Sequence, residues 1–155
     1  RWTWMRVFQC STGSSAMASE PDRIRIPIVS DLDLVAARQA GRRLAQELGF
    51  SSTDQTLIAT AISEVTRNIV QHATRGEVVV SRIHEPGRQG VLVVAQDAGP
   101  GIPDVDLALR EGYTTGGGLG LGLPGARRLM EEFELSSEVG KGTTVVMKKW
   151  TPSRG

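Results

Sequence analysis

An acid and an amide, Glu64 and Asn68, stand four residues apart in a segment with the apolar spacing of a helix. Positions four apart share one helix face, so both side chains are expected to point into one half-buried groove. The carboxylate of Glu64 is suited to take the proton of an attacking hydroxyl group. The amide of Asn68 offers a neutral oxygen to Mg²⁺, which takes few protein ligands beside substrate phosphates. Such a pair alone more often lies on a solvated face, but the motifs that follow favour a site.

Asp97 ends an expected strand and is followed by Gly99 and Gly101. Glycine lets the chain turn sharply, and it lets a flat ligand approach without meeting a Cβ atom. The carboxylate of Asp97 is an acceptor for an exocyclic amine such as that of adenine. By itself Asp-x-Gly-x-Gly is a common turn sequence.

A run of seven residues contains five glycines, and so many glycines make an ordered backbone costly. Such a run is expected where backbone N–H groups must approach a ligand without side chains in the way. The run merges into an expected helix, whose first turn would present free N–H groups and a positive dipole end to phosphates. A flexible surface loop is the alternative interpretation. A dinucleotide-binding fingerprint is discounted because the run follows a loop and no acidic residue stands about 20 residues further on. The run consists of Gly116, Gly117, Gly118, Leu119, Gly120, Leu121 and Gly122.

Strand and helix patterns alternate along the chain. Period-two and apolar runs predict strands at 23–28, 77–84, 91–96, 133–138 and 143–149. Helical spacing and start signals at Ser30 with Asp33 and at Ser52 with Gln55 predict helices ending near 49 and 73, and a third helix over 121–132. In the second helix a stripe of Ile58, Ile62, Val65 and Ile69 must face the sheet. These elements predict an α+β two-layer sandwich, with a mixed, mostly antiparallel sheet covered on one face by helices.

The 155 residues are enough for one sizeable core, and 39% hydrophobic with 23% charged residues is ordinary for a globular protein. No apolar run is long enough to span a membrane. Residues 1–16 differ in character and are interpreted as a disordered leader or cloning remnant, with residues 17–155 as one domain. Without Arg1 and Arg6 the chain has 16 basic and 17 acidic residues, which argues against a nucleic-acid partner. The single Cys, Cys10, lies in that leader, which excludes a disulfide framework.

The four motifs resemble, in order, the N, G1, G2 and G3 boxes of the GHKL ATPase superfamily. The resemblance is strongest to the RsbT-like switch serine/threonine kinases of the bacterial stressosome, and it covers about residues 23–150. The stretches that carry it are 33–42, 61–69, 97–104 and 118–130. The resemblance implies a Bergerat-type ATP-binding fold, with ATP between the helices and the sheet under a lid at about 102–115.

The same resemblance implies roles for individual residues. Glu64 would be the general base, Asn68 the Mg²⁺ ligand and Asp97 the adenine partner. Thr143 would be a second adenine contact through water, and the run from Gly116 to Gly122 would line the phosphates. Gly99, Gly101 and Ile102 would complete the nucleotide-binding set. Arg67 is either a contact to the protein substrate or a solvated arginine, and His72 is interpreted as a packing residue at the helix end.

The resemblance also implies partners. A kinase of this family phosphorylates STAS-domain scaffold and antagonist proteins of the stressosome and then activates a PP2C-type phosphatase, so a cytoplasmic partner-switching protein is expected. The alternative is an ATP-gated, non-catalytic binding module such as an anti-sigma factor, against which the retained Glu64 argues. A third possibility is an ATPase with no protein acceptor, which would release phosphate without any partner.

Overall fold

A computed structural model describes residues 23–110 and 122–152. Within these residues five strands form one sheet in the order β1-β2-β3-β5-β4. The strands are β1 (Arg23–Ile28), β2 (Gly76–Glu85), β3 (Arg88–Asp97), β4 (Glu132–Glu138) and β5 (Gly142–Trp150). All four pairings between them are antiparallel. The expected α+β sandwich is confirmed, although the described sheet is wholly antiparallel and not mixed. Strand β1, with Pro27, is an edge strand as its proline predicts.

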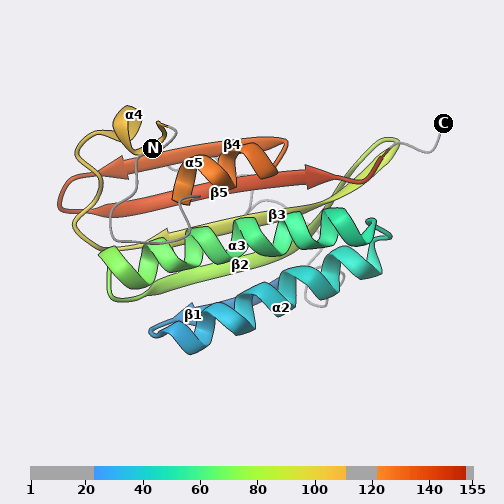
Figure 1. The fold of residues 1–155 in the computed structure, drawn as a ribbon, viewed down its shortest axis with the longest axis horizontal. Helices are drawn as coiled ribbons and strands as arrows, with labels where there is room; N and C mark the ends of the chain where they lie inside the picture. Colours follow the sequence, from blue (N-terminus) through green and yellow to red (C-terminus); the bar gives the residue numbers. More distant parts are fainter. Residues whose placement is uncertain (1–22, 111–121, 153–155) are drawn as a thin grey trace.

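Three helices lie on one face of this sheet: α2 (Asp31–Glu47), α3 (Ser52–His72) and α5 (Gly122–Leu129) (Figure 1). Helix α3 lies in the middle of this layer, with α2 on the β1 side and α5 on the β5 side. A short helix, α4 (Val105–Ala108), stands apart at one end of the sheet, near β4. It falls in the stretch that the sequence predicts to be a lid loop.

Hydrogen bonds at the helix starts explain where α2 and α3 begin. The Asp33 carboxylate accepts a hydrogen bond from the Ser30 backbone N–H at 3.1 Å, as the predicted start requires. For α3 the prediction was one residue late, because Ser51 and not Ser52 is the cap. The Ser51 hydroxyl accepts from the Asp54 backbone N–H at 3.1 Å. In the doublet Ser51-Ser52 the residue type alone does not decide which serine caps the helix.

The predicted stripe of α3 is confirmed: Ile58, Ile62, Val65 and Ile69 are all fully or almost fully buried in the main core. They pack against the inward valines of β2 and β3. Helix α2 approaches α3 closely at Gly41, where a Cβ atom would overlap Ile62. Since this stripe fixes the rotation of α3, the face that carries Glu64 and Asn68 must turn toward α5 and the end of β3.

The β2–β3 hairpin is tighter than the sequence predicts. Strand pairing continues to Glu85 and Arg88, so the turn consists of Pro86 and Gly87 alone. Gly87 has a φ of +84°, which suits a two-residue turn after proline. Within residues 23–110 and 122–152, no helix combines the length and apolar character needed to cross a bilayer.

Candidate nucleotide-binding site

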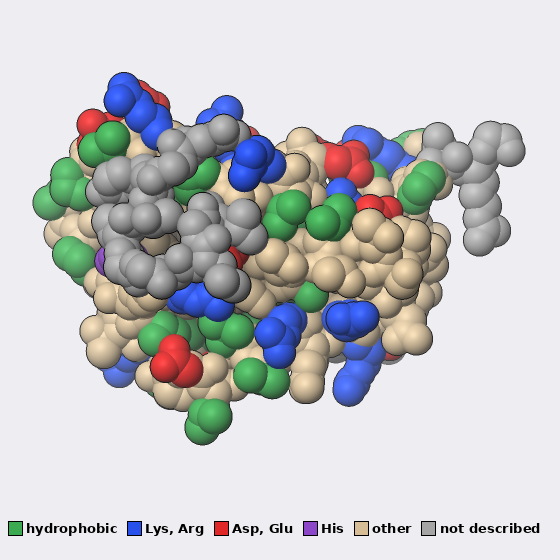
Figure 2. Space-filling view, viewed as in Figure 1, with side chains coloured by type: hydrophobic (Ala, Val, Ile, Leu, Met, Phe, Trp, Pro, Cys, Tyr) green, Lys and Arg blue, Asp and Glu red, His purple; other side chains and the backbone are tan. Residues whose placement is uncertain are grey.

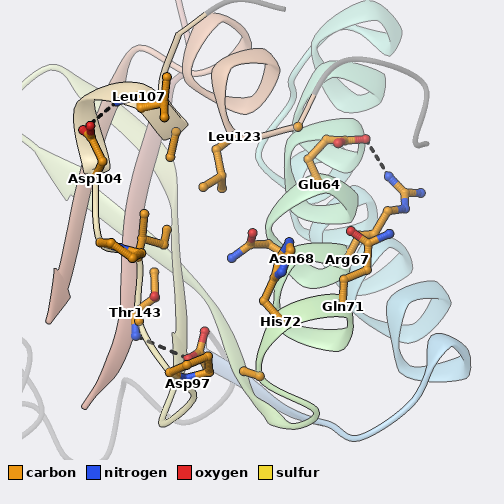
Figure 3. Close-up of a pocket in the computed structure, with 17 residues that line it drawn as sticks. Glu64, Arg67, Asn68, Gln71, His72, Asp97, Asp104, Leu107, Leu123 and Thr143 are labelled. Carbon is orange, nitrogen blue, oxygen red and sulfur yellow. Dashed lines mark hydrogen bonds and ion pairs between the residues drawn. The ribbon is translucent and has the colours of Figure 1, made fainter. Parts of the chain in front are cut away.

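A cavity of about 370 Å³ lies between α3 and the adjoining ends of β3 and β5 (Figure 3). Its walls come from α3, the segment after β3, α4, the first turn of α5 and the start of β5. The cavity brings together side chains that are up to 79 positions apart in the chain, from Glu64 to Thr143. The sequence-predicted residues that line it are Glu64, Arg67, Asn68, Asp97, Gly101, Ile102, Gly122 and Thr143.

Glu64 is held by its neighbour one helical turn away. Arg67 Nη1 donates to Glu64 Oε1 at 2.7 Å, and the two side chains are 31% and 8% exposed. No described residue donates a hydrogen bond to Glu64 Oε2. The carboxylate is therefore oriented through one oxygen and retains the other as a free acceptor. This ion pair was not anticipated for Arg67.

Asn68 points from α3 into the cavity (Figure 3). Its amide forms no hydrogen bond with the residues that the structure describes, so its oxygen is available to a ligand. His72 follows one turn later. The sequence favoured a packing role for it, and this was wrong: the residue is exposed and lines the cavity at the point where α3 ends.

Asp97 lies at the end of β3, across the cavity from α3 (Figure 3). Its Oδ1 accepts from the backbone N–H groups of Gly99 at 2.9 Å and Thr143 at 3.3 Å. Burial raises the pKa of this carboxyl above its ordinary value, and these two hydrogen bonds and the charge of His72 oppose the rise. Oδ2 accepts no hydrogen bond from the described residues, which leaves it free to accept one from a ligand.

Gly99 and Gly101 are needed for a different reason from the one their spacing suggested. A Cβ atom at Gly99 would lie 2.6 Å from the Ala73 Cβ, at the end of α3. Gly101 has a φ of +79°, and a Cβ there would overlap the carbonyl oxygen of Glu138. Both glycines therefore permit close packing of the chain on itself. Gly101 lines the cavity and Gly99 does not.

This packing gives a stability prediction for Gly101→Ala, with Gly87→Ala as the matched control. Both glycines have a φ near +80°, but the space around Gly87 is open. The control is expected to lose about 1 kcal/mol of unfolding free energy from the backbone conformation alone. Gly101→Ala is expected to lose at least about 2 kcal/mol, because the overlap with Glu138 adds to that cost. Urea denaturation of both variants measures the difference, and equal losses would contradict the packing argument.

Ser137, which the sequence did not single out, joins three parts of the site. Its Oγ accepts from the Ile102 backbone N–H at 2.7 Å, donates to the Gly142 carbonyl oxygen at 3.0 Å and lies 2.9 Å from Thr143 Oγ1. Gly140 N–H donates to the Pro100 carbonyl oxygen at 2.8 Å nearby. The segment after Asp97 is thereby fastened to the β4–β5 turn.

The remaining wall of the cavity includes residues that were not predicted. Asp104 caps α4 by accepting from the Leu107 backbone N–H at 3.0 Å, and both residues line the cavity. Asp104 stands immediately before Val105, and an aspartate in that position is an N-cap signal that could have revealed α4. The other unpredicted lining residues are Gln71, His72, Ala73, Pro100, Pro103, Ala108 and Leu123.

The glycine run is described only at its end. Residues 116–121 lie outside the described residues. Gly122 has a φ of +53° and begins α5, and both Gly122 and Leu123 line the cavity. The N-terminal end of α5 therefore opens on the cavity, as the sequence predicts for the helix after the run.

Comparisons with known proteins agree with this architecture. The family model "Histidine kinase-, DNA gyrase B-, and HSP90-like ATPase" matches residues 53–153. Serine/threonine-protein kinase RsbT of Bacillus subtilis (strain 168) is 46% identical over 129 residues, which are 83% of this chain and 97% of that protein. An anti-sigma F factor of Geobacillus stearothermophilus is 34% identical over 120 residues, 73% of this chain and 81% of the relative.

Among solved structures, the mycobacterial sensor histidine kinase MprB aligns with 84% of this chain and 99% of its own, at 16% sequence identity and a TM-score of 0.49. That likeness is too weak to support a conclusion, whereas the family model and the two sequence relatives each cover about two thirds of the chain or more. The chain therefore belongs to the histidine kinase-, DNA gyrase B- and HSP90-like ATPase family and, within it, to the RsbT-like serine/threonine-protein kinases.

Proposed function

We propose that this protein is a Mg²⁺- and ATP-dependent, cytoplasmic serine/threonine-protein kinase that phosphorylates STAS-domain partners of the stressosome. It would then act as a partner-switching regulator of a PP2C-type phosphatase. The proposal follows from its similarity to a serine/threonine-protein kinase over most of the chain. The observation that carries it is a buried carboxylate, Glu64, fixed through one oxygen in the same cavity as Asn68 and Asp97.

The cavity fits the adenine end of ATP. Adenine offers an exocyclic amine as a hydrogen-bond donor, and Asp97 Oδ2, at the cavity wall, accepts no hydrogen bond from the part of the chain that the structure describes. Oδ1 is tied to two backbone N–H groups, which keeps the carboxylate in one orientation. Thr143 lies beside it, and its hydroxyl shares a hydrogen bond with Ser137. This pair is placed to hold the water through which Thr143 would contact the base.

The opposite end of the cavity fits phosphates and a divalent metal ion. The amide oxygen of Asn68 is the kind of neutral oxygen donor that suits Mg²⁺ in company with phosphate oxygens. The first turn of α5, at Gly122 and Leu123, presents backbone N–H groups and the positive end of a helix dipole. The run from Gly116 to Leu121, proposed to line the phosphates, leads directly into that turn.

Few of the chain's own residues are needed for the transfer step. Bound ATP would supply the phosphoryl group that is transferred. No described residue donates a hydrogen bond to Glu64 Oε2, which would accept the proton of the attacking serine or threonine hydroxyl. The hydroxyl oxygen would bond to the γ-phosphorus as the bond from that phosphorus to ADP breaks, and ADP would leave. The hydrogen bond from Arg67 to Oε1 holds the Glu64 carboxylate in one orientation. Phosphoryl transfer depends mainly on positioning and charge stabilisation, so these few groups suffice.

A prediction for Arg67 follows from its contact with Glu64. Arg67→Gln is expected to lower kcat at least about tenfold, because the base is no longer held in one orientation. Arg67→Lys, which keeps the cation, is expected to restore part of the loss. ATP affinity should stay unchanged in both variants. A rise in the acceptor's KM with kcat intact would instead make Arg67 a substrate contact. Steady-state kinetics against a STAS-domain acceptor distinguish the two.

The test of the proposed function is direct. The protein is incubated with Mg·ATP and a stressosome STAS-domain protein, and the intact mass of the partner is read for one added phosphoryl group. A parallel reaction with EDTA removes the divalent metal. We expect the mass increase only in the presence of Mg²⁺. Unmodified partner, despite bound ATP and a formed complex, would overturn the kinase proposal.

The similarity to anti-sigma F factors favours one alternative, an ATP-gated binding module whose main action is sequestration. The two proposals differ in what ATP does. A kinase releases a phosphorylated partner, whereas a sequestering module retains an unmodified one. Phosphate release without any partner would indicate the third possibility, an ATPase with no protein acceptor.

A further inference from the structure

Ser137 is a polar residue on the otherwise apolar inner face of strand β4. Phe133 and Leu135 pack against the main core from this strand. Side chains two apart in a strand lie on the same face of the sheet, so Ser137 is turned to the same side. It does not line the cavity itself. A half-buried serine in an apolar row indicates a specific hydrogen-bonding role.

Strand pairing places Ser137 in one row with two residues of the nucleotide site. Ser137 is opposite Thr143 on β5, and Thr143 is in turn opposite Asp97 on β3. Directly opposite residues of antiparallel strands have their side chains on the same face of the sheet. The row therefore consists of a carboxylate and two hydroxyl groups, with Thr143 in the middle. Thr143 is only 5% exposed and lines the cavity.

The hydrogen bonds of Ser137 fix the direction in which Thr143 shares its proton. Ser137 Oγ accepts from the Ile102 backbone N–H at 2.7 Å and lies 3.0 Å from the Gly142 carbonyl oxygen. A carbonyl oxygen can only accept, so the single hydroxyl proton of Ser137 is directed to Gly142. The contact of 2.9 Å between Ser137 Oγ and Thr143 Oγ1 then requires the proton of Thr143. No other placement of the two protons satisfies all three contacts.

The direction of hydrogen bonds matters here because the proposed ligand group, the adenine base, is uncharged. Arg67 and His72 are the only cavity-lining residues of the described chain that can carry a positive charge, and Arg67 is paired with Glu64. Figure 2 shows most Lys and Arg side chains of the helix-covered face along its upper and lower margins. A neutral base is therefore oriented by a few polar groups with a fixed donor or acceptor character.

We infer that Ser137 is a positioning residue of the base site and that it acts through Thr143. Because Thr143 has given its one proton to Ser137, its Oγ1 offers only lone pairs to the cavity. A water beside Thr143 then donates one proton to Oγ1 and has its second proton available for an acceptor nitrogen of adenine. The role of Ser137 rests on the proposed kinase function, in which Thr143 contacts adenine through water.

The first test is a double-mutant cycle on ATP affinity. Ser137→Ala removes the orienting hydroxyl, Thr143→Val removes the hydroxyl that is oriented, and a third protein carries both changes. Displacement of a fluorescent nucleotide measures the affinity for Mg·ATP, and urea denaturation measures folding. Ser136→Ala is the matched control, because Ser136 is exposed and lies opposite Thr144 on the other face of the same strands.

Each single variant is expected to weaken ATP binding at least about fivefold. The double variant should bind ATP no more weakly than Thr143→Val, because Ser137 acts through Thr143. The control should match the wild type. Losses that multiply in the double variant, or a Ser137→Ala protein that loses stability but not ATP affinity, would overturn the role of Ser137 even if the wild type transfers phosphate normally. A wild type that binds no ATP would overturn the proposed function and this role together.

Neutron diffraction from a deuterium-exchanged crystal of the wild type is the second test, and it requires no nucleotide. It locates the deuterons of both hydroxyl groups directly. We expect the Thr143 deuteron to point at Ser137 Oγ and the Ser137 deuteron to point at the Gly142 carbonyl oxygen. A Ser137 deuteron directed at Thr143 would overturn the inference, whatever the outcome of the kinase assay.

Discussion

Glu64→Gln is expected to reduce phosphoryl transfer by on the order of 10² to 10⁴ while leaving ATP binding nearly intact. Glutamine has the size of glutamate and keeps an oxygen to accept the hydrogen bond from Arg67 Nη1. What it lacks is a group that takes a proton near neutral pH. Arg67 is partly exposed, so its charge remains solvated when its partner is neutral. The measurement is single-turnover transfer to a STAS-domain acceptor, with nucleotide affinity measured on the same preparation.

Glu85→Gln is the matched control for this variant. Glu85 pairs with Arg88 at 2.8 Å, also three residues away, but it lies at the β2–β3 hairpin and outside the cavity. Loss of an exposed ion pair there is expected to leave transfer unchanged. Equal transfer by Glu64→Gln and wild type would remove Glu64 from the role of base. Loss of both transfer and ATP affinity would show that the carboxylate shapes the nucleotide site instead.

The parts of the site that the sequence predicts are those set by local periodicity. The spacing of Glu64 and Asn68 on a helix with a clear apolar stripe fixes both their common face and its direction toward the groove. The same spacing logic applies to Arg67, three residues from Glu64. Its choice of partner was still left open, because an exposed arginine can also remain in solvent. In the structure Arg67 pairs with Glu64, which is buried beside it.

The parts that could not be predicted depend on pairing between strands that are distant in the chain. Asp97 lies opposite Thr143 because β3 pairs with β5 and not with the next strand in sequence. The hydrogen bond from Thr143 to Asp97 follows from that register. Ser137 reaches this end of β3 only because β5 pairs with both β3 and β4. Neither strand's residue pattern specifies its neighbour. The contacts of Gly99 with Ala73 and of Gly101 with Glu138 depend on how the segment after β3 packs against α3 and the β4–β5 turn. The sequence alone therefore could not tell whether these glycines permit close packing or leave space for a ligand.

Asp97→Asn is expected to weaken ATP binding by on the order of 10²-fold without destabilising the protein. The asparagine oxygen can keep the two backbone hydrogen bonds that Oδ1 accepts from Gly99 and Thr143. Its NH₂ group then replaces Oδ2 at the cavity and meets the adenine amine donor to donor. Burial raises the pKa of Asp97 above 3.8, so the folded protein binds this proton more tightly than the unfolded chain does. As the pH rises from about 3.8 through the higher pKa of Asp97 in the folded protein, the wild type loses unfolding free energy. The asparagine variant has no such proton to lose and keeps its unfolding free energy.

The variant should therefore be at least as stable as the wild type at pH 7, and its advantage should disappear as the pH falls toward about 4. Urea denaturation of both proteins across this range gives the difference, and a fluorescent nucleotide gives the affinity. Asp106→Asn, an exposed carboxylate on α4 outside the cavity lining, is the control and should change neither quantity. A variant that bound ATP normally would remove Asp97 from base recognition. Loss of stability together with affinity would mean that the carboxylate holds the β3–β5 end in place, and that the binding defect is secondary to packing.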